Sequence, residues 1–311
     1  MKLTEVVSLY ISHKRALGYR FRTEEAVLQS FCKVLGNASF ATIEAEAVLT
    51  FLNGSGSVTE YWVKKYRVLS GLYRFAQARG LTKVLPLPHT IPKPTDSAFV
   101  PYVYSHEEIK RLLNAVPAVC AGRVLVEEDV LRILLLLLYA TGLRIGEALA
   151  LTLNEVDLDQ ACLHIRETKF FKSRLVPIGK DFAELLTAYV FRLQKRYPAP
   201  AEKAALFCFR DGSSLSQSAA RSAFRRLRAH AGVLRVGNAR HQPRLHDLRH
   251  TAAVHRLIAW YRSGADLQEL LPKLATYLGH VDLSATQRYL TLTPELLQQA
   301  SLRFEHYAMG G

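Results

Sequence analysis

A tyrosine near the C-terminal end of the chain follows a histidine by nine residues, Tyr289 after His280. A phenol hydroxyl can attack phosphorus, but its ordinary pKa of about 10 makes it a poor nucleophile by itself. Cationic side chains occur in two earlier stretches, Arg144 in one and His246 with Arg249 in the other. Together these residues suit a phosphodiester substrate, whose phosphate the cations bind while the tyrosine attacks.

Phosphodiester cleavage needs a nucleophile, positive charge for the transition state, and groups that accept and donate a proton. Arginines and histidines accompany Tyr289, so a mechanism without metal or cofactor is the better fit. His246 and Arg249 are three residues apart at an expected helix start, which places both on one face. His246, His250 and His255 also have helical spacing, but no cysteine or carboxylate pattern typical of a metal site accompanies them.

A structural role is the alternative for each of these residues taken alone. A lone tyrosine near a chain end is usually a packing residue. A buried arginine such as Arg144 usually pairs with a carboxylate, and Glu147 lies three residues after it. Such an ion pair would also orient the guanidinium of Arg144.

The charge of the chain indicates a polyanionic partner. The formal charge is +14 with a pI near 9.7, and a chain this basic usually binds a polyanion. Eleven arginines and no lysine lie between Arg210 and Arg262, and the guanidinium binds two phosphate oxygens at once. Nucleic acid is favoured as the partner, an anionic membrane surface is the second possibility, and a plain excess of solvated basic side chains is the third.

The remaining composition favours a globular protein of a reducing cytoplasm. Hydrophobic residues make up 49% of the chain, enough for packed cores. The four cysteines are far apart, which argues against a disulfide framework and a zinc module. The most apolar run, 130–140, is about half the ~20 residues of a membrane span, and no membrane partner is expected.

The pattern of apolar residues predicts a mainly α fold with a small β-sheet, an α+β protein of two domains. Residues 1–85 have helical spacing throughout, and 86–104 contain five prolines, typical of a semi-rigid linker. The catalytic domain is expected over 105–290, with a β-hairpin between Cys162 and Ile178 whose tip is basic. The tail, 291–311, is apolar enough to dock on a neighbouring protomer.

Basic residues in three places are candidates for DNA contact. The fourth helix of the first domain combines basic and aromatic residues, the hairpin carries a basic tip, and a later helix presents arginines on one face. A solvated basic face is the alternative at every position. The candidates are Lys64, Lys65, Arg67, Lys172, Arg174, Arg221, Arg225 and Arg228.

With these residues in order, the second domain closely resembles the tyrosine recombinase (phage integrase) family, of the Xer-like or transposon-integrase kind. The resemblance is specific as a set and extends over the whole second domain, whereas the first 85 residues match only in length and helical pattern. It rests on four motifs, Thr141-Gly142-Leu143-Arg144-Ile145-Gly146-Glu147, Thr168-Lys169 with Val176-Pro177, His246-Asp247-Leu248-Arg249-His250-Thr251, and Leu278-Gly279-His280 leading to Thr286-Gln287-Arg288-Tyr289.

The resemblance implies a role for each matching residue. Tyr289 would attack the scissile phosphate and form a 3′-phosphotyrosyl link, and Arg144 and Arg249 would bind the nonbridging oxygens. Lys169 would donate the proton to the 5′ oxygen, because of its place in the hairpin turn, with Lys172 as the alternative. The supporting roles would fall to His246 in proton transfer, His280 in a hydrogen bond to the phosphate, and Glu147 in holding Arg144 and the histidines.

The resemblance also implies the partners. These are double-stranded DNA with a specific recombination site and a homotetramer, or a related recombinase, that exchanges strands through a Holliday junction, as in mobile elements. One departure is a longer interval between Arg249 and His280 than in compact Xer-like members, and residues 258–264 extend it. A type IB-like topoisomerase and a non-catalytic DNA-binding regulator are the competing functions.

Overall fold

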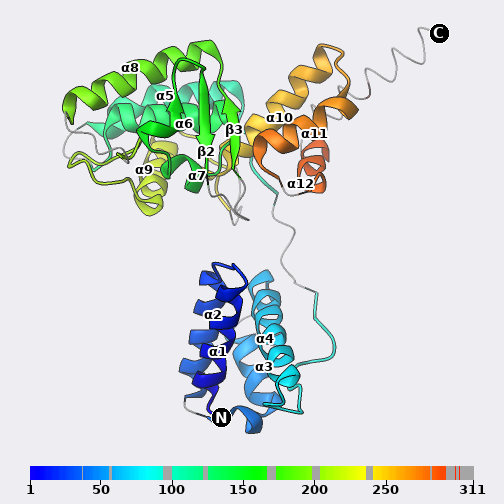
Figure 1. The fold of residues 1–311 in the computed structure, drawn as a ribbon. Helices are drawn as coiled ribbons and strands as arrows, with labels where there is room; N and C mark the ends of the chain where they lie inside the picture. Colours follow the sequence, from blue (N-terminus) through cyan, green and yellow to red (C-terminus); the bar gives the residue numbers. More distant parts are fainter. Residues whose placement is uncertain are drawn as a thin grey trace. The chain divides into compact units, whose positions relative to one another are not determined.

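The computed structural model describes residues 1–36, 38–55, 58–93, 100–121, 125–166, 173–197, 204–235, 241–280, 282–291, 298 and 301. The chain forms two compact units, residues 1–99 and 100–311 (Figure 1). Each unit has a hydrophobic core of its own. The predicted fold class, mainly α with one small sheet, is confirmed.

The first unit is a helical bundle, as its 3.6-residue apolar spacing predicts. Its elements are α1 (Leu3–Ala16), α2 (Arg22–Leu35), η1 (Phe40–Thr42), α3 (Ala45–Asn53) and α4 (Glu60–Ala78). Thr59 caps α4 by accepting a hydrogen bond from the backbone N–H of Trp62. The indole Nε1 of Trp62 donates to Asn53 Oδ1 at 2.9 Å, which joins the ends of α3 and α4.

The two ends of the predicted proline-rich linker pack into the units. Leu87 is buried in the core of the first unit, and the Tyr66 hydroxyl donates to the carbonyl of Pro88 at 3.2 Å. Tyr104 is fully buried in the second unit, where its hydroxyl donates to the carbonyl of Arg244 at 2.8 Å and its backbone N–H donates to Thr251 Oγ1 at 3.0 Å. The aromatic side chains at the C-terminal end of the linker thus belong to the core of the second unit.

The second unit is built around the leucine-rich helix α6, which contacts α5, α8 and α10. Its buried residues are apolar apart from Thr141, and burial of their surface stabilises the core. The helices and 3-10 turns are α5 (His106–Cys120), α6 (Glu128–Thr141), α7 (Ile145–Leu149), η2 (Leu153–Glu155), α8 (Lys180–Arg196), α9 (Gln217–His230), α10 (Asp247–Arg262), α11 (Leu267–Leu278), α12 (Ser284–Gln287) and η3 (Arg288–Thr291).

One antiparallel sheet of order β1-β2-β3 accompanies these helices. Its strands are β1 (Val156–Asp157), β2 (Cys162–Ile165) and β3 (Arg174–Pro177). Cys162 pairs with Pro177 and Ile165 pairs with Arg174, which confirms the predicted hairpin. Its tip lies outside the described residues, and with it Lys169 and Lys172.

The helices α10 and α11 and the 3-10 turn η3 form a small core of their own, and α11 contacts β3 (Figure 1). The buried side chains of α10 and α11 in it include Val254, Leu257 and Leu278, and Tyr289 of η3 packs among them. Asp266 caps α11, because its carboxylate accepts from the backbone N–H groups of Gln268 and Glu269. No helix among the described residues is long and apolar enough to cross a membrane.

Candidate active site

The candidate residues lie at the ends of four elements of the second unit. Arg144 is the N-cap of α7, and Arg249 lies in the first turn of α10, which His246 precedes. His280 follows Gly279, the left-handed C-cap of α11, and Tyr289 lies in η3. Backbone groups at the ends of helices have no partner within the helix, and the two arginines bind such groups.

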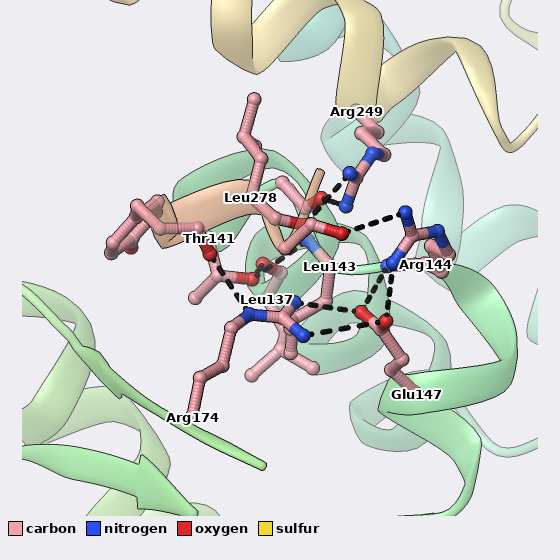
Figure 2. A network of polar contacts seen from close by, with 11 residues as sticks. Leu137, Thr141, Leu143, Arg144, Glu147, Arg174, Arg249 and Leu278 are labelled. Atoms are coloured by element: carbon pink, nitrogen blue, oxygen red, sulfur yellow. Dashed lines mark hydrogen bonds and ion pairs between the residues drawn. The ribbon is translucent and has the colours of Figure 1, made fainter. Parts of the chain in front are cut away.

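Arg249 is bound by main-chain carbonyls. Its Nη1 donates to the carbonyl of Gly142 at 2.6 Å and its Nη2 to the carbonyl of Leu278 at 2.8 Å (Figure 2). The side chain is only 3% exposed. Burial, followed by the nearby charge of Arg144, lowers the pKa of the Arg249 guanidinium to about 10. It remains a cation at neutral pH, held between the C-terminal ends of α6 and α11.

Arg144 is more accessible than Arg249. Its Nη1 donates to Glu147 Oε1 at 2.7 Å, and its Nη2 donates to the carbonyl of Gly279 at 3.0 Å. One third of the side chain, 33%, is exposed. The second bond connects Arg144 to the turn that presents His280, so both candidates depend on the same backbone segment.

Glu147 bridges two arginines rather than an arginine and the histidines. Its carboxylate, 8% exposed, accepts from Arg144 and also from Arg174 of β3, whose Nη2 lies 2.8 Å from Oε2 (Figure 2). Burial acts to raise the pKa of the Glu147 carboxyl, but the bonds from Arg174 and Arg144 outweigh it and the pKa is lowered. The predicted support of Arg144 by Glu147 is present, whereas the second partner is Arg174 and not a histidine.

Tyr289 is surrounded by imidazole rings. Its ring is 3% exposed and lies 5.6 Å from the ring of His250 and 5.9 Å from that of His280, centroid to centroid. His280 Nδ1 lies 2.6 Å from Thr286 Oγ1, which fixes the orientation of its ring. His246 and His250 are also in ring contact at 5.1 Å. The structure therefore brings the tyrosine and three histidines together.

His250 was not among the predicted site residues. The sequence did contain a signal for it, since His250 lies four residues after His246 and one turn places both on the same helix face. Its Nδ1 is buried without a hydrogen-bond partner among the described residues. A buried imidazole nitrogen in this state disfavours protonation of the ring.

The protein environment lowers the pKa of all three histidines. Burial is the largest cause for each, and it lowers the pKa of His250 and of His280 to about 4. The second largest cause is the electrostatic effect of His246 on the pKa of His250 and of Arg249 on the pKa of His280. The pKa of His246 is lowered as well, by the protein packed around the ring and then by Arg249, although part of its surface faces solvent. At neutral pH the three rings are uncharged and can accept a proton.

These lowered pKa values predict a loss of stability in acid. Unfolded imidazoles titrate near pH 6.5, whereas His250 and His280 titrate near 4 in the fold. Between these values the unfolded state binds more protons, so stability is full above about pH 6.5 and is lost as the pH falls toward 4. After a reduction for partial exposure of both rings, we expect the free energy of unfolding in urea to fall by roughly 2 kcal/mol across this window.

Two variants separate the contribution of the histidines to the pH dependence of stability from that of the carboxylates. His280→Asn should make the dependence of the unfolding free energy on pH shallower, because the depressed imidazole is gone. His230→Asn, at an exposed position at the end of α9, serves as the control and should keep the wild-type slope. An unchanged slope in His280→Asn would contradict the assignment.

Gly279 is required by both its backbone and its surroundings. Its φ is +70°, and a Cβ there would lie 2.6 Å from Nη1 of Arg174. Gly264 has a similar φ of +72° with open space around it, so Gly264→Ala measures backbone strain alone, roughly 1 kcal/mol. We expect Gly279→Ala to lower the free energy of unfolding by about 1–2 kcal/mol more than this control, because Arg174 must move. Equal losses in the two variants, measured by urea unfolding, would show that Arg174 yields freely.

The predicted DNA-contacting residues divide into two groups. Lys64 is partly buried and Arg67 is exposed on α4, and Arg221 and Arg225 are exposed on α9. Three others are engaged within the protein. Lys65 Nζ binds the carbonyls of Phe51 and Leu52 at the end of α3, Arg228 Nη1 donates to the carbonyl of Pro243, and Arg174 is held by Glu147. A basic side chain that completes a helix end or a buried ion pair is not displayed on the surface.

The arrangement combines the elements of acyl- or phosphoryl-type chemistry on an anionic substrate. Arg144 and Arg174 share the carboxylate of Glu147 and keep a net positive charge. The buried cation Arg249 interacts electrostatically with the Tyr289 phenol, and uncharged imidazoles stand next to that phenol to accept a proton. In the part of the chain that the structure describes, no three His, Cys, Asp or Glu side chains are grouped as ligands for a metal ion.

Comparison with other proteins identifies the family of the chain. The family model described as "Phage integrase family" matches residues 103–295, which contain all the candidate catalytic positions. The chain is 35% identical over 304 residues to integrase/recombinase y4rB of Sinorhizobium fredii, covering 97% of this chain and 96% of the relative. It is 32% identical over 244 residues to tyrosine recombinase XerD of Mycobacterium leprae, covering 74% and 68%.

A solved structure has the same fold. The XerH site-specific recombinase, bound to a palindromic difH substrate as a post-cleavage complex, superimposes with a TM-score of 0.66 at 22% identity, covering 97% of this chain and 85% of XerH. The predicted family is thereby confirmed over both units of the chain. With the match of its second unit to the family model and its relatives at above 30% identity, the chain belongs to the phage integrase family of tyrosine recombinases.

Proposed function

We propose that the protein is a site-specific DNA recombinase that cleaves and rejoins DNA through a covalent link between Tyr289 and a 3′ phosphate. The observation that carries this most strongly is the burial of the Tyr289 ring against His250 and His280 in the same small core as the carbonyl that holds Arg249. Energy of the cleaved phosphodiester is kept in the phosphotyrosyl bond, so rejoining needs no ATP.

Each residue contributes one step in this proposal. Arg144 and Arg249 bind the nonbridging oxygens and stabilise the charge that develops on the phosphate. His246 accepts a proton and His280 donates a hydrogen bond to the phosphate. Lys169, outside the described residues, donates the proton to the leaving 5′ oxygen. Metal and cofactor have no part in the proposal.

The partners follow from the same proposal. The substrate is a double-stranded DNA site, as in the XerH complex, and the basic charge of +14 supports binding to it. Residues 1–85 also bind the DNA, and the exposed arginines of α9 contact phosphates. Four protomers, or this protein together with a related recombinase, assemble on two sites and exchange strands through a Holliday junction, with the tail docked on a neighbour. The activity takes place on DNA in a bacterial cytoplasm.

Covalent capture tests the proposal and needs no defined DNA site. The protein is mixed with duplexes that carry a randomised core, the reaction is stopped with detergent, and protein-linked DNA is recovered and sequenced. We expect an enriched sequence attached through Tyr289, identified by mass spectrometry of the linked peptide. Absence of adduct on every duplex would leave a DNA-binding regulator, and attachment through another residue would overturn the assignment of the nucleophile.

Strand exchange separates a recombinase from a topoisomerase-like enzyme. Two captured duplexes of different length are mixed with the protein, and the products are resolved by size. We expect recombinants that combine the two lengths. Relaxation of a supercoiled plasmid carrying the site, with no recombinant product, would instead indicate a type IB-like topoisomerase.

A further inference from the structure

Arg174 has all of its guanidinium nitrogens engaged inside the protein. Its Nη2 donates to Glu147 Oε2 at 2.8 Å, its Nη1 lies 3.4 Å from Glu147 Oε1, and its Nε donates to the carbonyl of Tyr277 at 3.0 Å (Figure 2). The side chain is 11% exposed. Three of its five N–H donors are thus used inside the protein, and burial leaves little of the guanidinium facing a DNA phosphate, which was the role predicted for it.

These contacts connect three elements that carry the candidate site. Arg174 begins β3, Glu147 belongs to α7 behind Arg144, and Tyr277 lies in the last turn of α11 before Gly279. The backbone of Gly279 packs so closely on Arg174 that a Cβ there would lie 2.6 Å from Nη1. The carbonyl of Gly279 in turn accepts from Nη2 of Arg144. One guanidinium therefore sets the distance between the Arg144 side chain and the turn that presents His280.

The charge balance gives Arg174 a second effect on Arg144. Glu147 is a buried carboxylate with two cationic partners. If Arg144 were its sole partner, the ion pair would cancel most of the positive charge that a phosphate requires. With Arg174 also paired to Glu147, the three groups keep a net positive charge. The arginine among them with a third of its side chain exposed is Arg144, so the surplus charge faces the accessible side.

We propose that Arg174 is a positioning residue for the recombination reaction, which orients Arg144 and the Gly279–His280 turn and offsets the charge of Glu147. This inference rests on the proposed function. It also relates the β2–β3 hairpin to the phosphate site, because Arg174 lies five residues after Lys169 in the sequence and anchors the strand that leaves the hairpin tip.

The test compares Arg174→Gln and Arg174→Lys with Arg166→Gln on a duplex recovered by covalent capture. Arg166 is the matched control, because it follows β2 in the same hairpin but is 65% exposed and lies 3.9 Å from Glu155. The measured quantities are single-turnover cleavage at saturating protein, the Kd for the duplex at several salt concentrations, and the cleavage rate as a function of pH.

We expect Arg174→Gln to cleave roughly 10²-fold more slowly than wild type, with a Kd within about twofold of wild type and an unchanged salt dependence. Loss of one of the two cations weakens the effect that lowers the pKa of Glu147, so the acid limb of the pH–rate profile should move to higher pH. Arg174→Lys keeps the charge but cannot reach all three acceptors. It should keep the wild-type acid limb and cleave at an intermediate rate, while Arg166→Gln behaves as wild type.

Other outcomes overturn the inference in different ways. A weaker Kd with a salt slope reduced by about one and a normal rate at saturation would make Arg174 a phosphate contact. If Arg174→Gln cleaved slowly but its acid limb did not shift, Arg174 would have only a role in folding. If the variant cleaved at the normal rate, Arg174 would have no role in the site. A defect confined to Arg174→Gln leaves the proposed function intact, whereas a wild-type protein that forms no adduct overturns both.

Discussion

Tyr289→Phe should bind the captured duplex as wild type does and form no covalent adduct. The change removes only the hydroxyl, the one atom that the proposed chemistry uses, and loss of a nucleophile lowers turnover by roughly 10⁴-fold or more. The ring itself is retained, so its packing against His250 and His280 is conserved. Gel-shift titration for binding and detergent-resistant adduct on a nicked suicide duplex are the two measurements.

Tyr197→Phe is the matched control for this variant. Tyr197 follows α8, away from the site residues, and its hydroxyl donates to the carbonyl of Arg210 at 2.7 Å. Its loss removes one solvent-accessible hydrogen bond, which contributes about 1 kcal/mol at most, and the adduct should form at nearly the wild-type rate. Adduct in Tyr289→Phe at the wild-type level would mean that another group attacks the phosphate.

Arg249→Gln should abolish most of the cleavage while weakening the fold. A buried cation next to the transition state contributes roughly 10³-fold or more in rate to phosphoryl and acyl transfer. The substitution also leaves the carbonyls of Gly142 and Leu278 without their strong donors. Each buried acceptor left unpaired destabilises by about 1–3 kcal/mol. We expect slower single-turnover cleavage at saturating protein and a lower urea midpoint together.

Two companion variants separate these effects. Arg256→Gln alters an exposed arginine on the same helix, α10, and should change neither quantity by much. Arg249→Lys keeps a cation that reaches one carbonyl but lacks the fork that reaches both, so it should recover stability more than rate. If Arg249→Gln cleaved normally once its folding was secured by low temperature, the role of Arg249 at the phosphate would be refuted.

The secondary structure of this chain was largely accessible from local pattern. The helical spacing predicted over residues 1–85 corresponds to α1, α2, α3 and α4, and the helix start expected at His246 corresponds to α10, because helical spacing is a local signal. The β2–β3 hairpin followed from alternation on either side of a basic segment. The described motif residues Arg144, Arg249, His280 and Tyr289 also gather in space. Spacing alone suggested proximity only for His246 with Arg249 and for Arg144 with Glu147.

What local pattern could not show is the partner of each charged or aromatic side chain. Arg174 in a hairpin resembles any surface arginine until Glu147, 27 residues away in the sequence, is folded against it. Lys65 on α4 likewise completes the carbonyls at the end of α3. Tyr104 followed a run of prolines that indicated an extended linker, yet its ring is buried by contacts with residues about 140 positions later. Such burial depends on tertiary contacts that neither periodicity nor charge encodes.

The small core that holds Tyr289 is separate from the large one that holds α5, α6 and α8. In the language of local unfolding, a cooperative unit with few buried side chains opens at a lower free energy than the main core of the same domain. We therefore expect the part of the fold around the proposed nucleophile to open at a lower free energy than the main core. Contacts from outside that stabilise this unit would raise the fraction of protomers with the tyrosine in place. Reactivity would then depend on that fraction as well as on the geometry of the site.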